Sequence, residues 1–268
     1  MAQKKRHNRH RSDFLPEREI ESLFAEKQGL GKPAVDGRPE LRMWYKAGEA
    51  HPLTYKHTEG IGPDQAYDYD NLADEWYKWF LRTPAPLSVY ANPEGEYGED
   101  DRNGLAFPEE NAFVYFGAAS PFRNPDVRRI HITKRAPFFV PVYNVAASLE
   151  QFPSKRNEKN LLELIRKDLA GIKEETLEAK LNGRHLYGRC VIRDQPLNIP
   201  NIPRDNVFDI EPERLSDGET GLSIDLYHGG LWLLIREDEL TPGDHLLYFK
   251  VESVNYEMET KFIINAHY

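Results

Sequence analysis

The chain has 268 residues, of which 35 are Lys or Arg and 44 are Asp or Glu, so its formal net charge is −9. With 40% hydrophobic residues it is too apolar for a wholly disordered protein, and with 29% charged residues it is too polar for an integral membrane protein. The one cysteine, Cys190, excludes an internal disulfide and a zinc site made of cysteines.

Positive charge is concentrated at the N-terminus. Residues 1–11 carry five basic residues and no acid, and removing these five charges from the net charge of −9 leaves −14. We expect a disordered basic arm that solubilises the chain, docks on an acidic protein surface, or neutralises the phosphates of a polyanion. If the chain contacts nucleic acid, only this arm would make the contact, because the acidic remainder repels phosphates. The basic residues of the arm are Lys4, Lys5, Arg6, Arg9 and Arg11.

Residues 12–66 are interrupted repeatedly by Gly and Pro, which predicts an extended segment that wraps a larger body, with one short helix near residues 16–27. Residues 67–268 are expected to form a single β-sandwich domain. Residues 1–11 lack the features of a secretory signal peptide, and no later stretch reaches the ~20 apolar residues of a membrane span. The sequence therefore predicts a cytoplasmic protein or a component of an assembled particle.

A helix is predicted from Asp68 or Asp70 to the stop at Pro84, with Leu72, Trp76, Trp79 and Phe80 on one face. Tryptophans at this spacing are typical of a buried core, whereas on an exposed face they would form a platform for sugar stacking. Acids cluster at the start of this helix, where the helix dipole is a sufficient explanation. The acids are Asp68, Asp70, Asp74 and Glu75.

A second helix is predicted within residues 153–172, from a candidate N-cap at Ser154 to Gly171. Its apolar face consists of Leu161, Leu162, Leu164, Ile165 and Leu169.

The remaining segments favour β-strands. A buried strand is predicted at 111–119, and the segments 128–134 and 137–145 resemble a β-hairpin whose second strand is an edge or contains a bulge because of its prolines. Asn182-Gly183 is a strong hairpin signal. Further strands are predicted at 207–210, 222–227, 231–235, 245–253 and 257–266. The expected fold is mainly β (α+β), an antiparallel β-sandwich or jelly-roll-like architecture with two or three peripheral helices.

Common catalytic motifs do not occur in the sequence, and we predict neither a metal nor a cofactor. Cys190 lies between Arg189 and Arg193, which would lower the pKa of an exposed thiol, whereas a buried cysteine in a strand is inert. The histidines lack metal-ligand spacing, but a meeting of His131, His228 or His245 in space is left open. Calcium binding by the acidic loop 94–101 is also left open, although it lacks the EF-hand pattern.

Several short motifs follow one another in a fixed order. They are W-x-x-W (Trp76, Trp79), N-P-x-x-G (Asn92, Pro93, Gly95), a buried aromatic strand (113–116), a strand led by Arg129, F-F-x-P-x-x-N (Phe138, Phe139, Pro141, Asn144), N-G-x-x-L (Asn182, Gly183, Leu186), G-x-W-L-L (Gly230, Trp232, Leu233, Leu234) and P-G-x-H-x-L-x-F (Pro242, Gly243, His245, Leu247, Phe249). Over about residues 70–268 the chain resembles a sparsely described family of microbial proteins of unknown function, often secreted. The resemblance implies no catalytic residues.

Two functional hypotheses follow. The first is a non-catalytic structural or binding component of a larger assembly, with a protein partner or a second copy of the chain bound through the arm and the sheet surfaces. The second is a glycan- or small-molecule-binding module, or an enzyme, with its site on the sandwich. The candidate ligand-binding residues of that site are Arg129, Asn144, Trp232 and His245. As an alternative, His245 would cap the turn at Pro242-Gly243, and Arg129 would pair with Asn144 across the predicted hairpin.

Overall fold

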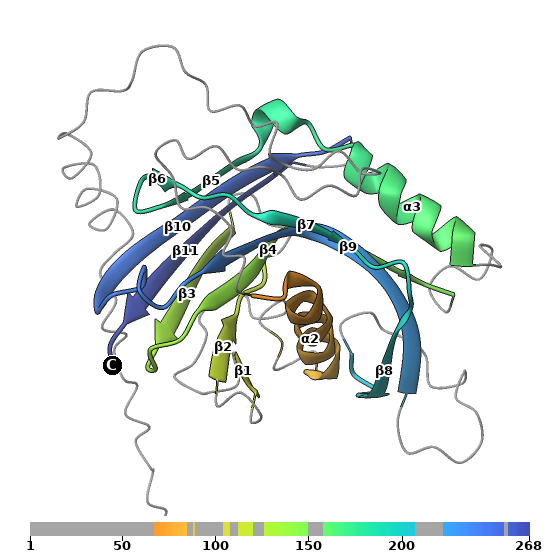
Figure 1. Ribbon diagram of the computed structural model, residues 1–268, viewed down its shortest axis with the longest axis horizontal. Coiled ribbons are helices and arrows are strands. Elements are labelled where there is room, and N and C mark those ends of the chain that lie inside the picture. Colours follow the sequence, from red (N-terminus) through yellow and green to blue (C-terminus); the bar gives the residue numbers. More distant parts are fainter. Residues whose placement is uncertain are drawn as a thin grey trace, which may run out of the picture. The chain divides into compact units, whose positions relative to one another are not determined.

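Most of the described chain lies in β-strands, and two α-helices accompany them, which confirms a mainly-β α+β fold (Figure 1). A computed structural model describes residues 67–84, 88, 104–107, 112–119, 126–149, 158–206, 222–254 and 257–268. These residues fall within one compact unit of the chain, 34–268. The expectations for residues 1–66, the acidic loop 94–101, Ser154 and the strand 207–210 lie outside the described residues.

One sheet is organised around β9 (Leu222–Ile235), a long strand that curves strongly along its length (Figure 1). One edge of β9 pairs with β4 (Phe138–Ser148), and β7 and β8 share the other edge. The register of β4 shifts between Pro141 and Tyr143, which confirms the bulge predicted from the prolines. The other strands of this six-stranded sheet are β1 (Gly104–Phe107), β2 (Ala112–Phe116), β7 (Arg189–Ile192) and β8 (Leu197–Ile202).

Residues 222–227 and 231–235, predicted as two strands, belong to the single strand β9. Two glycines separate them in the sequence, but these glycines form no turn. A Cβ atom at Gly229 would lie 2.9 Å from Ile165 Cγ2, and a Cβ atom at Gly230 would lie 2.6 Å from the main-chain oxygen of Tyr143. The glycines therefore allow α3 to pack closely on β9 and allow the bulged part of β4 to approach β9 closely.

The second sheet has five strands in the order β3-β11-β10-β5-β6. Its β11 has the predicted bounds, and β5 and β6 form the predicted hairpin with positive φ at both turn residues, Asn182 (51°) and Gly183 (80°). The strands of this sheet are β3 (Asp126–Ile132), β5 (Glu178–Leu181), β6 (Arg184–His185), β10 (Gly243–Glu252) and β11 (Glu257–Ala266).

The predicted hairpin of 128–134 with 137–145 is wrong, because its two strands belong to different sheets. Strand β3 pairs in parallel with β11, whereas β4 pairs in parallel with β2 and antiparallel with β9. Both sheets are therefore mixed rather than wholly antiparallel. The chain turns a corner between them where the Tyr115 hydroxyl accepts hydrogen bonds from the main-chain N–H groups of Thr133 (3.0 Å) and Lys134 (3.1 Å).

Helix α2 (Tyr69–Arg82) begins at the N-cap Asp68, whose Oδ1 accepts hydrogen bonds from two main-chain N–H groups of the first turn. Helix α3 (Glu158–Ala170) ends at Gly171, as predicted, and the 3₁₀ turn η4 (Glu174–Thr176) follows it. Neither of the described α-helices combines the length and the apolar character needed to cross a membrane.

The two faces of the six-stranded sheet pack against different partners. Helix α2 lies within the curve of the sheet (Figure 1), where the rings of Trp76 on α2 and Trp232 on β9 are 5.4 Å apart. The opposite face contacts α3 at one end and the five-stranded sheet at the other, where Phe138 meets Phe262 with ring centroids 5.6 Å apart. The described core is thus a helix, a curved sheet, and a third layer of α3 beside the second sheet.

Candidate functional site

The four candidate ligand-binding residues are divided between the two sheets. Asn144 and Trp232 both contact Tyr77 of α2, at an Nδ2–Oη distance of 3.2 Å and a ring-centroid distance of 6.1 Å. Arg129 and His245 belong to the five-stranded sheet, where the alternation of burial places Arg129 on the outer face and His245 on the inner face. The structure brings together only Asn144 and Trp232, and it separates Arg129 from Asn144.

His245 belongs to a network that closes two turns. Its Nε2 lies 2.6 Å from the carbonyl oxygen of Thr241, on the other side of the Pro242-Gly243 turn. Because a carbonyl oxygen only accepts, Nε2 carries the proton, and Nδ1 accepts a 2.9 Å hydrogen bond from Asn182 Nδ2. The Asn182 Oδ1 in turn accepts from the main-chain N–H of Leu246. His245 therefore has the turn-capping contact that the sequence offered as an alternative.

Trp232 is fully buried within an aromatic cluster. Its ring stacks on Phe139 at a centroid distance of 5.0 Å and meets Trp76 edge to face at 5.4 Å. Trp76 is also buried, and its indole N–H donates to the main-chain oxygen of Gly117 at 2.7 Å. Trp79 is partly buried against the same core. Trp76 thus has the role of a core anchor.

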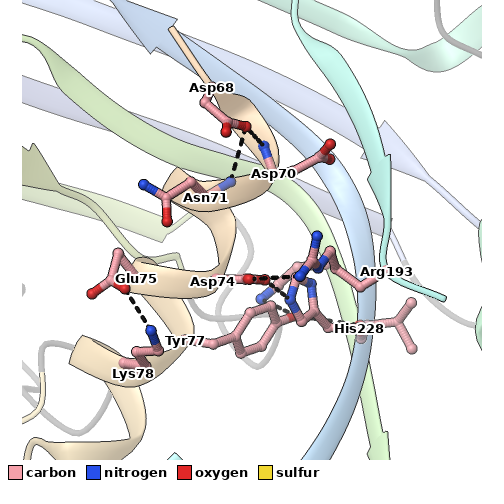
Figure 2. Close-up of polar contacts among 11 residues, drawn as sticks. Asp68, Asp70, Asn71, Asp74, Glu75, Tyr77, Lys78, Arg193 and His228 are labelled. Carbon is pink, nitrogen blue, oxygen red and sulfur yellow. Dashed lines mark hydrogen bonds and ion pairs between the residues drawn. The ribbon is translucent and has the colours of Figure 1, made fainter. Parts of the chain in front are cut away.

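The most concentrated group of buried polar side chains joins α2 to the six-stranded sheet. We call Asp74, Tyr77, Arg193 and His228 the Asp74 cluster (Figure 2). Asp74 points from α2 toward the sheet, where its Oδ1 lies 2.8 Å from Nε2 of His228 and its Oδ2 lies 3.1 Å from Nη2 of Arg193. The His228 side chain is 0% exposed and that of Asp74 is 11% exposed, whereas the Arg193 side chain is 34% exposed. One carboxylate thus joins a buried ring to a partly exposed cation.

Tyr77 covers the ring of His228, with the two centroids 4.4 Å apart. The Tyr77 hydroxyl donates to the main-chain oxygen of Val145 and accepts from Asn144 Nδ2, both at 3.2 Å. Together with the Asp74 contacts, these bonds connect α2 to β4, to β9 and to the end of β7.

The hydrogen bonds of His228 define its proton. The Asp74 carboxylate only accepts, so the neutral ring carries its proton on Nε2, and the buried Nδ1 has no hydrogen-bond partner. Burial lowers the pKa of His228, because the charged ring would lose its hydration, and the hydrogen bond and charge of Asp74 oppose this effect only in part. The site therefore favours the neutral form of His228.

No protein-family model, curated protein or solved structure matches this chain. The family resemblance described above therefore stays a prediction. The interpretation of the Asp74 cluster rests on its own geometry.

The thiol of Cys190 does not have the properties of an activated nucleophile. Burial raises its pKa to about 12, although Arg189 and Arg193 are close in sequence. Among the described residues, no group of three or more His, Cys, Asp or Glu side chains is arranged to hold a metal ion. His131 meets His267, with ring centroids 5.4 Å apart, while His228 lies on the other sheet.

Sequence reasoning missed the pairing of Asp74 with His228, two residues 154 positions apart. It assigned Asp74 to the group of acids at the helix start. A signal was nevertheless present, because Asp74 lies three residues before Tyr77 and seven before Leu81, on the buried side of α2. A charged residue at such a position requires a buried partner, but its spacing does not identify that partner.

Proposed function

We propose that this protein is a non-catalytic structural or binding component of a larger assembly, which acts through its sheet surfaces and the basic arm of residues 1–11. The best support is the way the chain uses its polar and aromatic side chains. Trp232 and Asp74 fasten α2 to the six-stranded sheet, and His245 closes a turn. All three are buried. Groups held in such contacts stabilise the fold instead of facing a substrate.

The charge distribution supplies a mechanism for association. Five positive charges in residues 1–11 belong to a chain whose remainder has a net charge of −14, so the arm of one molecule attracts the acidic body of another. The proposed partner is a second copy of the chain, bound head to tail, or another protein with an acidic surface. Because such contacts are exposed, salt screens them over a Debye length of about 8–10 Å.

The test compares the full chain with two variants by multi-angle light scattering and sedimentation velocity. One variant lacks residues 1–11, and the matched control keeps their length but replaces Lys4, Lys5, Arg6, Arg9 and Arg11 with Gln. We expect the full chain to associate at about 20 mM salt and to dissociate at about 500 mM, and we expect both variants to remain dissociated at either concentration. Association that is equal in all three proteins, or absent from the full chain, would contradict the proposal.

One observation favours the alternative of a glycan- or small-molecule-binding module: Asn144 is only partly buried, and it lies beside Tyr77 near Trp232. A thermal-shift screen with neutral and acidic sugars distinguishes the two functions. A saturable shift that disappears in Asn144→Ala would support the alternative. The absence of any shift of the wild-type chain with these sugars would contradict the alternative.

A further inference from the structure

The Asp74 cluster holds a titratable ring in a buried position that offers no acceptor for a second ring proton. His228 is fully buried, its Nε2–H donates to Asp74, and its Nδ1 lies in the interior without a hydrogen-bond partner. A second proton would bind at Nδ1 and produce a buried N–H donor with no acceptor, which is an unfavourable arrangement.

We propose that the Asp74 cluster makes the packing of α2 against the six-stranded sheet sensitive to acid, because protonation of His228 weakens the contacts between them. These contacts come from one helix: Asp74 and Tyr77 both belong to α2, and both contact the His228 ring or its proton. Helix α3 packs on the opposite face of the same sheet, where the Tyr143 hydroxyl donates to Asp168 at 2.5 Å. The opening of α3 can therefore be compared with the opening of α2 in the same molecule.

Charged groups from two neighbouring elements act on His228. From α2, Asp74 is in direct contact and Asp70 acts at longer range, and both favour a protonated ring. From the end of β7, Arg193 disfavours protonation by charge repulsion and also competes for the Asp74 carboxylate.

Two further residues, on β4 and on β9 itself, are not among the groups that shift the pKa of His228. From β4, the residue opposite His228 is Ala146, which does not titrate. On β9 itself, Asp225 is exposed and accepts a hydrogen bond from Asn198. Burial is the largest single contribution and keeps the pKa of His228 below its ordinary value.

The direction of the pH effect follows from linkage. When α2 separates from the sheet, His228 meets water and regains a pKa near 6.5, so the open state binds a proton that the closed state rejects. The closed state is fully favoured above about pH 6.5 and loses this advantage as the pH falls toward the lowered pKa. The opening constant is the equilibrium constant for the separation of α2 from the sheet. If the closed state stays unprotonated, this constant rises about eightfold between about pH 7.0 and about pH 5.5.

Amide hydrogen exchange on the intact chain measures this constant, after correction for the intrinsic pH dependence of exchange. We expect the α2 amides to show the rise and the α3 amides to show none. In His228→Gln, the new amide can still donate to Asp74 but does not titrate, so the excess opening of α2 should disappear. The matched control is His185→Gln, because His185 also has a lowered pKa but lies on the other sheet. It should leave the response of α2 unchanged.

Three results would overturn the proposal: no excess opening of α2 at low pH, an equal rise in α2 and α3, or an unchanged rise in His228→Gln. A direct titration covers the case in which His228→Gln does not fold. In the wild-type chain labelled with ¹⁵N-histidine, the ring of His228 should stay neutral with its proton on Nε2 well below pH 6.5. A His228 ring that titrates at or above its ordinary pKa would also refute the proposal.

Discussion

Replacing Asp74 with alanine is expected to lower the free energy of unfolding by about 2–3 kcal/mol. The largest part comes from the Nε2–H of His228, which would remain in a fully buried position without its acceptor. A stranded buried donor costs about 1–3 kcal/mol. The ion pair with Arg193 adds at most about 1 kcal/mol, because the Arg193 side chain is 34% exposed and the pair is screened by solvent. The higher helix propensity of alanine offsets about 0.5 kcal/mol of this loss.

Because the two contacts of Asp74 differ in burial, single replacements of its partners separate them. We expect Arg193→Ala to lower the free energy of unfolding by no more than about 1 kcal/mol, clearly less than Asp74→Ala. Asp70→Ala is the matched control for the charge at the helix start, since Asp70 is exposed on the first turn and its loss costs about 0.3–1 kcal/mol. Guanidinium unfolding, followed by tryptophan fluorescence and circular dichroism at about pH 8, measures all three with His228 neutral.

An equal loss in Arg193→Ala and Asp74→Ala would show that the exposed ion pair, and not the buried hydrogen bond, holds α2 on the sheet. A loss in Asp74→Ala no larger than that in Asp70→Ala would show that Asp74 contributes only what any acid near a helix N-terminus contributes. Either result would contradict the prediction.

Two further predictions use the same unfolding experiment. Gly230→Ala should cost about 3 kcal/mol, because its Cβ would lie 2.6 Å from a main-chain oxygen of β4. Gly229→Ala should cost less, about 1–2 kcal/mol, because its nearest contacts are methyl groups of Ile165 and Leu169 and its main-chain contact, with the oxygen of Val191, is longer at 3.2 Å. Equal losses would show that the closer main-chain contact is not decisive. Arg128→Met should cost about 3–5 kcal/mol, because Arg128 Nε binds the Asp126 carboxylate at 2.8 Å and both side chains are 0% exposed. A loss below about 1 kcal/mol would contradict the burial of this pair.

Local patterns in the sequence predicted the elements whose stabilising interactions are local. Asp68 starts α2 because its side chain reaches N–H groups two and three residues away, and this geometry is encoded within one turn. The Asn182-Gly183 hairpin was predictable for the same reason, since a two-residue turn needs positive φ at both positions. The strand predicted at 257–266 is local in the same sense, because Met258, Phe262 and Ile264 are buried and alternate with charged residues that are not.

Pairing between strands was not predictable in the same way. The short connection between Ile132 and Phe138 suggested a hairpin, yet the strands on its two sides join different sheets. An alternating strand specifies which face is buried but not which strand lies beside it. The corner depends on the Tyr115 hydroxyl, which comes from β2 and is invisible in the local pattern of 126–148. Long-range contacts of this kind select one topology among several that the same periodicity allows.

The Asp74 cluster depends both on local sequence patterns and on long-range pairing between elements. The position of Asp74 among buried residues of α2 indicates that some partner must compensate its charge, and the nearly continuous apolar run around His228 indicates a buried ring. Each observation by itself is compatible with many partners. Only the curvature of β9 around α2 brings the two together, so the chemistry of the cluster follows from the topology and not from a motif. The acid sensitivity proposed for this cluster therefore depends on the curvature of the sheet as much as on the histidine itself.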